Sequence, residues 1–301
     1  MTDILASMKL AEAIRQFLED GELAQGLSER TIANYQHYLD RFLEHANDIA
    51  VSAISDELVR TWRLELHRKG NLSKATQNYH LVALRALLAW LAKKNIPSMS
   101  SEKIDLPGVD EPEVVFLQAE AIAKLLAAPH SESLRGKRDG AMLETLFSTG
   151  LRVAELVSLD RLDVEGREEV SVLGKGKKRR VVFLSPNAQT RIKTYLAARA
   201  DSDPALFIKE KGNEHNSNRL TVRSIQRLIQ HYAQLAGVAE HVTPHTLRHT
   251  FATDLLQSGA DLRAVQTLLG HSSVVTTQRY THLTDTHLKE VHQAFHGRRR
   301  D

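Results

Sequence analysis

The chain has 301 residues, of which 42% are hydrophobic and 26% are charged, and its formal net charge is +3. This composition is typical of a globular protein with two domains or one large one. The absence of cysteine excludes disulfides and thiolate nucleophiles. No apolar run approaches the roughly 18 residues that a membrane span requires, and the start of the chain lacks the pattern of a secretory signal.

The first hundred residues predict a bundle of four helices. Apolar residues recur at helical spacing over residues 8–20, and Ser28, Ser55 and Ser73 are placed to cap three further helices. The last of these should end near Pro97. We therefore expect a helical domain over residues 1–100, with no catalytic chemistry visible in it.

Residues 101–115 interrupt the helical pattern. Pro107, Gly108 and Pro112 occur among several acidic residues, and proline both removes a backbone donor and extends the chain. We expect this stretch to be a linker between the helical domain and a second domain over residues 116–301.

The second domain is predicted to be mixed α+β, so the whole chain should be mainly α with one small β-hairpin. Two β-branched runs at residues 170–173 and 181–184 flank a glycine-containing turn at 174–180. An apolar helix should end at Gly150. Further helices are expected near residues 186–200, 221–236, 244–258, 262–269 and 284–296.

The hairpin turn is strongly basic. It contains Lys175 between two glycines, followed by Lys177, Lys178 and Arg179. Such a turn is often simply solvated. Alternatively, the glycines allow close approach to a phosphate, which Lys175 and its neighbours would contact.

Arg152 lies just after Gly150 and three residues before Glu155. At that spacing the two side chains can form a surface ion pair. Glu155 is better interpreted as an internal partner that orients a neighbour than as a catalytic base. On its own, Arg152 would not indicate a site.

His245, Arg248 and His249 fall on one predicted helix, which Thr243 and Pro244 should begin. A histidine pair four apart can bind zinc, but the glutamate of the usual H-E-x-x-H signature is replaced by Thr246. We therefore expect no metal site.

His271 follows Gly270 and could be a histidine at a helix C-terminus. Tyr280 lies nine residues further on, and most tyrosines are packing residues. A tyrosine hydroxyl, with a pKa of about 10, is a poor nucleophile unless cations surround its target. The arginines and histidines nearby in sequence are what distinguish Tyr280.

Together these segments resemble the tyrosine recombinase (phage integrase) family, and most closely its bacterial Xer-type members. The matching segments are G-L-R-x-x-E-L at residues 150–156, G-K-G at 174–176, H-x-L-R-H at 245–249, L-G-H at 269–271 and Tyr280. Each motif is weak alone, whereas five in the family's order are specific. The helical first domain is similar to the family's core-binding domain, so the resemblance covers nearly the whole chain.

The resemblance implies a role for each matched residue. Arg152, Arg248 and His271 would contact the scissile phosphate, and Tyr280 would be the nucleophile that forms a 3′-phosphotyrosine. His245 would assist removal of the tyrosine proton, and Lys175 would protonate the leaving 5′ oxygen. Lys177, Lys178 and Arg179 would hold DNA phosphates. None of the six catalytic positions is substituted, so an active enzyme that needs no cofactor is implied.

The resemblance also implies partners. The protein would bind double-stranded DNA as a homotetramer, or as a heterotetramer with a paralogous recombinase, on paired sites, with a DNA translocase as a candidate activator and no membrane contact. A nucleoid-associated, cytoplasmic role in chromosome partition and cell division is implied, by resolution of chromosome or plasmid dimers. Three alternatives stay open: an integrase of a phage or mobile element, a DNA-binding regulator that does not cut, and a histidine-based metallohydrolase.

Overall fold

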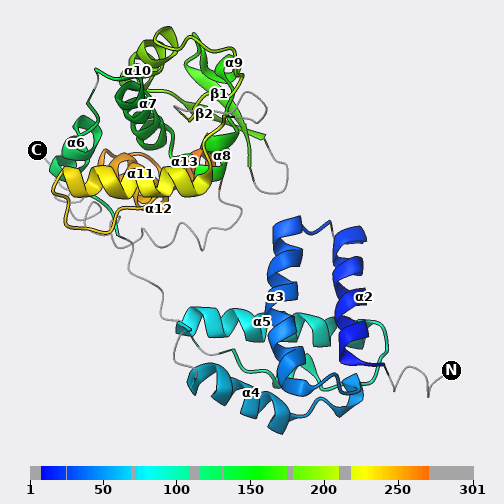
Figure 1. The fold of residues 1–301 in the computed structure, drawn as a ribbon. Coiled ribbons are helices and arrows are strands. Elements are labelled where there is room, and N and C mark those ends of the chain that lie inside the picture. Colours follow the sequence, from blue (N-terminus) through cyan, green and yellow to red (C-terminus); the bar gives the residue numbers. More distant parts are fainter. Residues whose placement is uncertain are drawn as a thin grey trace, which may run out of the picture. The chain divides into compact units, whose positions relative to one another are not determined.

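The chain forms two compact units, residues 1–112 and 113–301, each with its own hydrophobic core (Figure 1). The computed structural model describes residues 8–24, 26–68, 72–106, 108, 115–130, 132–174, 179–209 and 218–270. Within these residues the fold is mainly helical with one two-stranded sheet. The predicted fold class is therefore confirmed.

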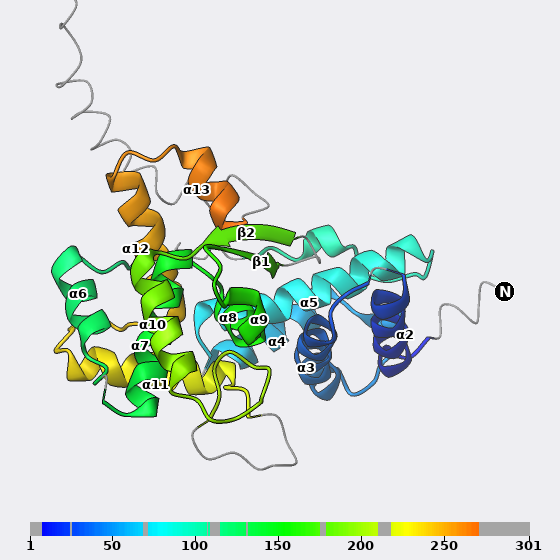
Figure 2. The ribbon, with the colours of Figure 1, turned by 90° about the horizontal axis from the view of Figure 1, so that it is seen from above.

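The four predicted helices of the first unit are present. They are α2 (Leu10–Leu23), α3 (Glu29–Ala46), α4 (Asp56–Arg68) and α5 (Lys74–Lys93). Helices α2 and α3 pack side by side, and α5 runs across both (Figures 1 and 2). The hydroxyls of Ser28, Ser55 and Ser73 accept backbone N–H groups of the first turns of α3, α4 and α5, as predicted for N-caps.

The first unit continues past residue 100. A short 3-10 helix, η2 (Ser101–Lys103), contacts α5, and Ile104 is only 2% exposed within the core that contains Trp62 and Leu84. Burying a side chain of this size stabilises a fold by about 1.5–3 kcal/mol. Residues 101–104, which we expected at the start of the linker, therefore belong to the first unit.

Helix α7 (Leu134–Thr149) is the centre of the second unit, where it packs against α10 (Pro186–Ala197) and α12 (Pro244–Gln257). Two short helices were not predicted, α6 (Ala119–Ala127) and α9 (Arg161–Val164). Among the described residues of this unit, the remaining helices are α8 (Val153–Ser158), α11 (Val222–Leu235) and α13 (Leu262–Leu269). The helix expected at residues 284–296 lies outside the described residues.

Strands β1 (Glu169–Leu173) and β2 (Arg179–Phe183) form the predicted antiparallel hairpin. The second strand begins earlier than expected, because Arg179 and Arg180 pair with Leu173 and Val172 and so lie in the strand rather than in the turn. Alternation along β2 leaves Arg179 exposed and turns Arg180 towards the interior, on the same face as buried Val182. Figure 2 shows α13 beside β2.

Candidate catalytic site

The site is built where two helices end on glycines. Gly150 ends α7 and Gly270 ends α13, both with left-handed backbone (φ +60° and +63°) that side chains disfavour. A side chain at position 150 would collide with Phe251 of α12, because its Cβ would lie 2.4 Å from that ring. The sequence thus brings the ends of α7 and α13 close to α12.

Arg152 follows Gly150 and caps the N-terminus of α8. Its backbone N–H donates to Glu155 Oε2 at 2.7 Å, and its Nη1 donates to Glu155 Oε1 at 3.1 Å. The Arg152 side chain is about one-third exposed, whereas that of Glu155 is only 6% exposed. The predicted Arg152–Glu155 pair is therefore present, and Glu155 orients the arginine as expected.

Arg248 lies on α12 and is 5% exposed. Its Nη1 donates to the Gly150 carbonyl and its Nη2 to the Leu269 carbonyl, each at 2.5 Å. One guanidinium thus joins the turn after α7 to the end of α13. A charged group buried to this extent requires such partners.

The last carbonyls of α13 each receive an arginine. Arg180 Nε donates to Leu268 at 3.1 Å, Arg248 donates to Leu269, and Arg152 Nη2 makes a longer contact of 3.5 Å with Gly270. Carbonyls at a helix C-terminus lack partners within the helix and carry partial negative charge. Three guanidinium groups, from the N-cap of α8, from α12 and from β2, therefore gather at the end of α13, immediately before His271 in the sequence.

His245 lies three residues before Arg248, in the first turn of α12, and is exposed. Thr243 and Pro244 begin this helix as predicted. Partial desolvation lowers the pKa of His245, and the charges of Arg248 and Arg152 lower it further. The ring is consequently neutral at pH 7 and able to accept a proton.

Of the predicted site residues, Arg152 and Arg248 both contact carbonyls at the end of α13, and His245 lies close enough for their charges to lower its pKa. Arg179 lies on the exposed face of β2. The other predicted site residues, Lys175, Lys177, Lys178, His271 and Tyr280, lie outside the described residues. Arg180 was missed as part of the site. The available signal was its place two residues before the apolar Val182, on the inward face of a strand.

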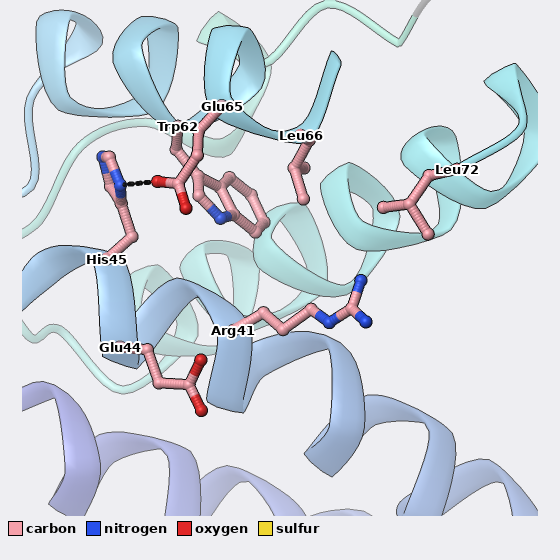
Figure 3. Close-up of a pocket in the computed structure, with 7 residues that line it drawn as sticks. All are labelled: Arg41, Glu44, His45, Trp62, Glu65, Leu66 and Leu72. Carbon is pink, nitrogen blue, oxygen red and sulfur yellow. Dashed lines mark hydrogen bonds and ion pairs between the residues drawn. The ribbon is translucent and has the colours of Figure 1, made fainter. Parts of the chain in front are cut away.

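A separate cavity of about 660 Å³ lies in the first unit (Figure 3). It is lined by Arg41, Glu44, His45, Trp62, Glu65, Leu66 and Leu72. His45 Nδ1 lies 2.5 Å from Glu65 Oε2, which links α3 to α4 across the cavity. Because Glu44 and Glu65 line it together with Arg41 and His45, the cavity does not by itself indicate a phosphate site.

Within the part of the chain that the structure describes, no group of three His, Asp or Glu residues could hold a metal ion. Nor does any helix in those residues have the length and apolar character needed to cross a membrane.

Comparison with protein-family models gives two matches. Residues 115–287 match the phage integrase family, and residues 14–95 match the phage integrase N-terminal SAM-like domain. The two matches cover most of each structural unit.

Individual proteins are similar over nearly the full length. The tyrosine recombinase XerD of Oceanobacillus iheyensis is 35% identical over 301 residues, covering 96% of this chain and 99% of that protein. The tyrosine recombinase XerC of Thermodesulfovibrio yellowstonii is 35% identical over 295 residues, covering 94% and 95%. A solved structure of the XerH recombinase on palindromic difH DNA, a post-cleavage complex, is 23% identical with a TM-score of 0.71, covering 92% of this chain and 83% of that one.

Proposed function

Because this chain belongs to the phage integrase family of tyrosine recombinases, enzymes that break and rejoin DNA, we propose that it exchanges strands at a specific site through a phosphotyrosine at Tyr280. The observation that carries this proposal is the convergence of Arg152, Arg248 and His245. Arg248 donates hydrogen bonds to the ends of α7 and α13, and Arg152 contacts the end of α13. His245 lies near enough for both arginine charges to lower its pKa. Two clustered arginines beside a neutral histidine suit a phosphodiester better than a neutral substrate.

Arg152 and Arg248 donate to the non-bridging oxygens of the scissile phosphate, and His271 donates to the same group. Negative charge on these oxygens increases as the tyrosine attacks, so donors already in place stabilise the transition state more than the ground state. Guanidinium groups suit this task because they are planar and stay charged at working pH. Loss of one donor of this kind typically lowers the rate by about 10²–10³.

Proton transfers accompany the exchange of bonds. The Tyr280 oxygen forms a bond to phosphorus while the bond from phosphorus to the 5′ oxygen breaks. His245 assists removal of the tyrosine proton, which its lowered pKa supports by keeping the ring neutral. Lys175 gives a proton to the leaving 5′ oxygen. Lys177, Lys178 and Arg179 hold neighbouring phosphates and thereby set the register of the duplex.

The reaction conserves the energy of the broken phosphodiester. Its products are a 3′-phosphotyrosine and a free 5′ hydroxyl, so a 5′ hydroxyl from another strand can attack the phosphotyrosine and release Tyr280. No nucleotide or metal cofactor enters this balance. Joining two duplexes through all four strands requires four tyrosines, and we therefore propose four protomers on paired sites, either identical or shared with a paralogous recombinase.

Within this chemistry, the best-supported role is Xer-like resolution of chromosome or plasmid dimers. The support is 35% identity to both a XerD and a XerC protein over almost the whole chain. That role would place the protein on cytoplasmic nucleoid DNA, in chromosome partition and cell division, with a DNA translocase as candidate activator. An integrase of a mobile element would use the same chemistry.

The test begins by finding the DNA site. Sequencing the DNA recovered with the Tyr280→Phe variant from cells identifies bound sites, from which a nicked suicide substrate is built. The wild-type protein is expected to form a covalent protein–DNA adduct on this substrate, and Tyr280→Phe is expected to form none.

Each alternative gives a different result. An adduct that persists in Tyr280→Phe would show that another residue is the nucleophile. Sequence-specific binding by the wild-type protein without any adduct would indicate a regulator that does not cut. Cleavage that EDTA abolishes would favour a metal-dependent hydrolase. Loss of dimer resolution in cells lacking the protein would support the Xer-like role. Unchanged dimer resolution in those cells would favour a mobile-element integrase.

A further inference from the structure

Arg180 and Glu155 form a nearly buried ion pair between β2 and α8. Arg180 Nη1 donates to Glu155 Oε1 and Arg180 Nη2 to Glu155 Oε2, each at 2.7 Å, and the two side chains are 10% and 6% exposed. This is the parallel fork-to-carboxylate geometry that only arginine provides. The nucleophile, the general acid and the phosphate donors proposed above do not include Arg180.

The same carboxylate also serves Arg152. Glu155 Oε1 accepts Arg152 Nη1, and Glu155 Oε2 accepts the Arg152 backbone N–H. Two guanidinium groups therefore share one negative charge, and the cluster of the three side chains keeps a net charge of +1. Without Arg180, the Glu155 charge would fall on Arg152 alone, and the cluster would lose its positive charge.

Arg180 also contacts the end of α13. Its Nε donates to the Leu268 carbonyl at 3.1 Å. Its aliphatic stem passes against Gly270, where an added Cβ would lie 2.9 Å from Arg180 Cδ. The side chain thus connects the strand after the basic turn, the carboxylate that orients Arg152, and the residue that precedes His271 in the sequence.

We propose that Arg180 is a positioning residue, which neutralises Glu155 so that the Arg152 guanidinium remains available to the scissile phosphate. This inference rests on the proposed function. Arg180 acts through Glu155 and the α13 terminus and makes no contact with DNA itself. A buried carboxylate that loses its principal partner attracts the remaining cation, so loss of Arg180 would bind Arg152 more tightly to Glu155.

The experiment compares Arg180→Gln, Arg180→Lys and the double variant Arg180→Gln with Glu155→Gln. The readouts are the single-turnover rate of adduct formation at saturating suicide DNA and the Kd for that DNA. Arg180→Gln is expected to slow adduct formation about 10–100-fold, less than loss of a phosphate donor itself, with little change in Kd. Arg180→Lys keeps the positive charge and should slow adduct formation less than Arg180→Gln does. The double variant removes the unneutralised charge and should regain about tenfold over Arg180→Gln alone.

Arg138→Gln is the matched control. Arg138 is also a buried arginine that donates to a carboxylate, that of Asp139, and to a backbone carbonyl, that of Ile208. It should lower thermal stability, but the folded fraction should form adduct at the wild-type rate.

Several results would overturn the inference. If the double variant is no faster than Arg180→Gln, Arg180 does not act by neutralising Glu155. A large increase in Kd with an unchanged rate would show that Arg180 binds DNA directly. Wild-type rates in a folded Arg180→Gln protein would show that it has no role. If the wild-type protein itself forms no adduct, the proposed function fails instead.

Discussion

The protonation of His245 depends on its neighbours at the start of α12. Partial desolvation, then Arg248 and Arg152, lower its pKa below the usual value of about 6.5. A base acts in its neutral form, and a lowered pKa extends that form to more acidic solution. We therefore expect kcat/KM for adduct formation to be constant near pH 7 and to fall on the acidic side with a midpoint below 6.5. The measurement is adduct formation at subsaturating DNA, which reports the pKa of the free enzyme.

Two variants separate His245 from the other histidines. His245→Asn should lower the rate and remove the acidic fall, since asparagine does not titrate. His231→Gln changes an exposed histidine on α11 and should leave the profile unchanged. A midpoint above 6.5, or an acidic fall that survives in His245→Asn, would contradict the assignment.

At the level of single residues, the sequence could predict the pairs that local spacing creates. Arg152 and Glu155 are three residues apart in one helical turn, and their contact follows from helix geometry. The stronger partner of Glu155, Arg180, is 25 residues away in a strand. No local period connects a helix N-terminus to a strand, and the sequence pattern alone places Arg180 in the turn. Tertiary packing alone brings the two together.

At the level of elements, the turn after α7 depends on Gly150. An alanine there meets both the cost of left-handed backbone, about 1–2 kcal/mol, and a collision with Phe251, for which overpacking typically costs about 1–3 kcal/mol. We expect Gly150→Ala to lower the free energy of unfolding by about 2–5 kcal/mol in total. It should also slow adduct formation, since Arg248 binds the Gly150 carbonyl. Chemical denaturation followed by circular dichroism gives the first quantity.

Gly237→Ala is the matched control for this prediction. Gly237 also has left-handed backbone after a helix (φ +67°), but an added Cβ would have no neighbour within 4 Å. This variant should lower the free energy of unfolding only by the backbone cost of about 1–2 kcal/mol, with an unchanged rate of adduct formation. Equal losses in the two variants would show that Phe251 gives way without cost.

Elements with strong local signals were predictable, and those without were missed. Serine caps and helical spacing predicted α3, α4 and α5, and Thr243 with Pro244 predicted α12. Helix α6 has only 9 residues and no side-chain N-cap, and α9 spans only one turn, so neither gives a strong signal in the sequence. The predicted start of strand β2 is later than its actual start at Arg179. The usual signal for a strand is a run of β-branched residues, and the arginines that begin β2 do not give it.

At the level of the whole molecule, two separate cores were predictable from the two blocks of apolar periodicity. The end of the first unit was not, because the prolines and acidic residues after residue 100 resemble a linker throughout. Ile104 is one apolar residue among them, and a single residue has no period. Ile104 joins the first core through tertiary packing, since η2, which directly precedes it, contacts α5.

The extent of the first unit can be tested with two fragments, residues 1–100 and residues 1–112. Both contain α2 to α5, and only the longer one contains Ile104, which is 2% exposed. Since removing a buried side chain of this size costs about 2–5 kcal/mol, the longer fragment should unfold with a free energy higher by about that amount. In the longer fragment, Ile104→Ala should remove most of the difference, whereas Leu106→Ala, at a position 36% exposed, should change it little. Urea denaturation followed by helical circular dichroism measures all four proteins. Equal stability of the two fragments would restore the boundary at residue 100, because Ile104 would then add nothing to the first core.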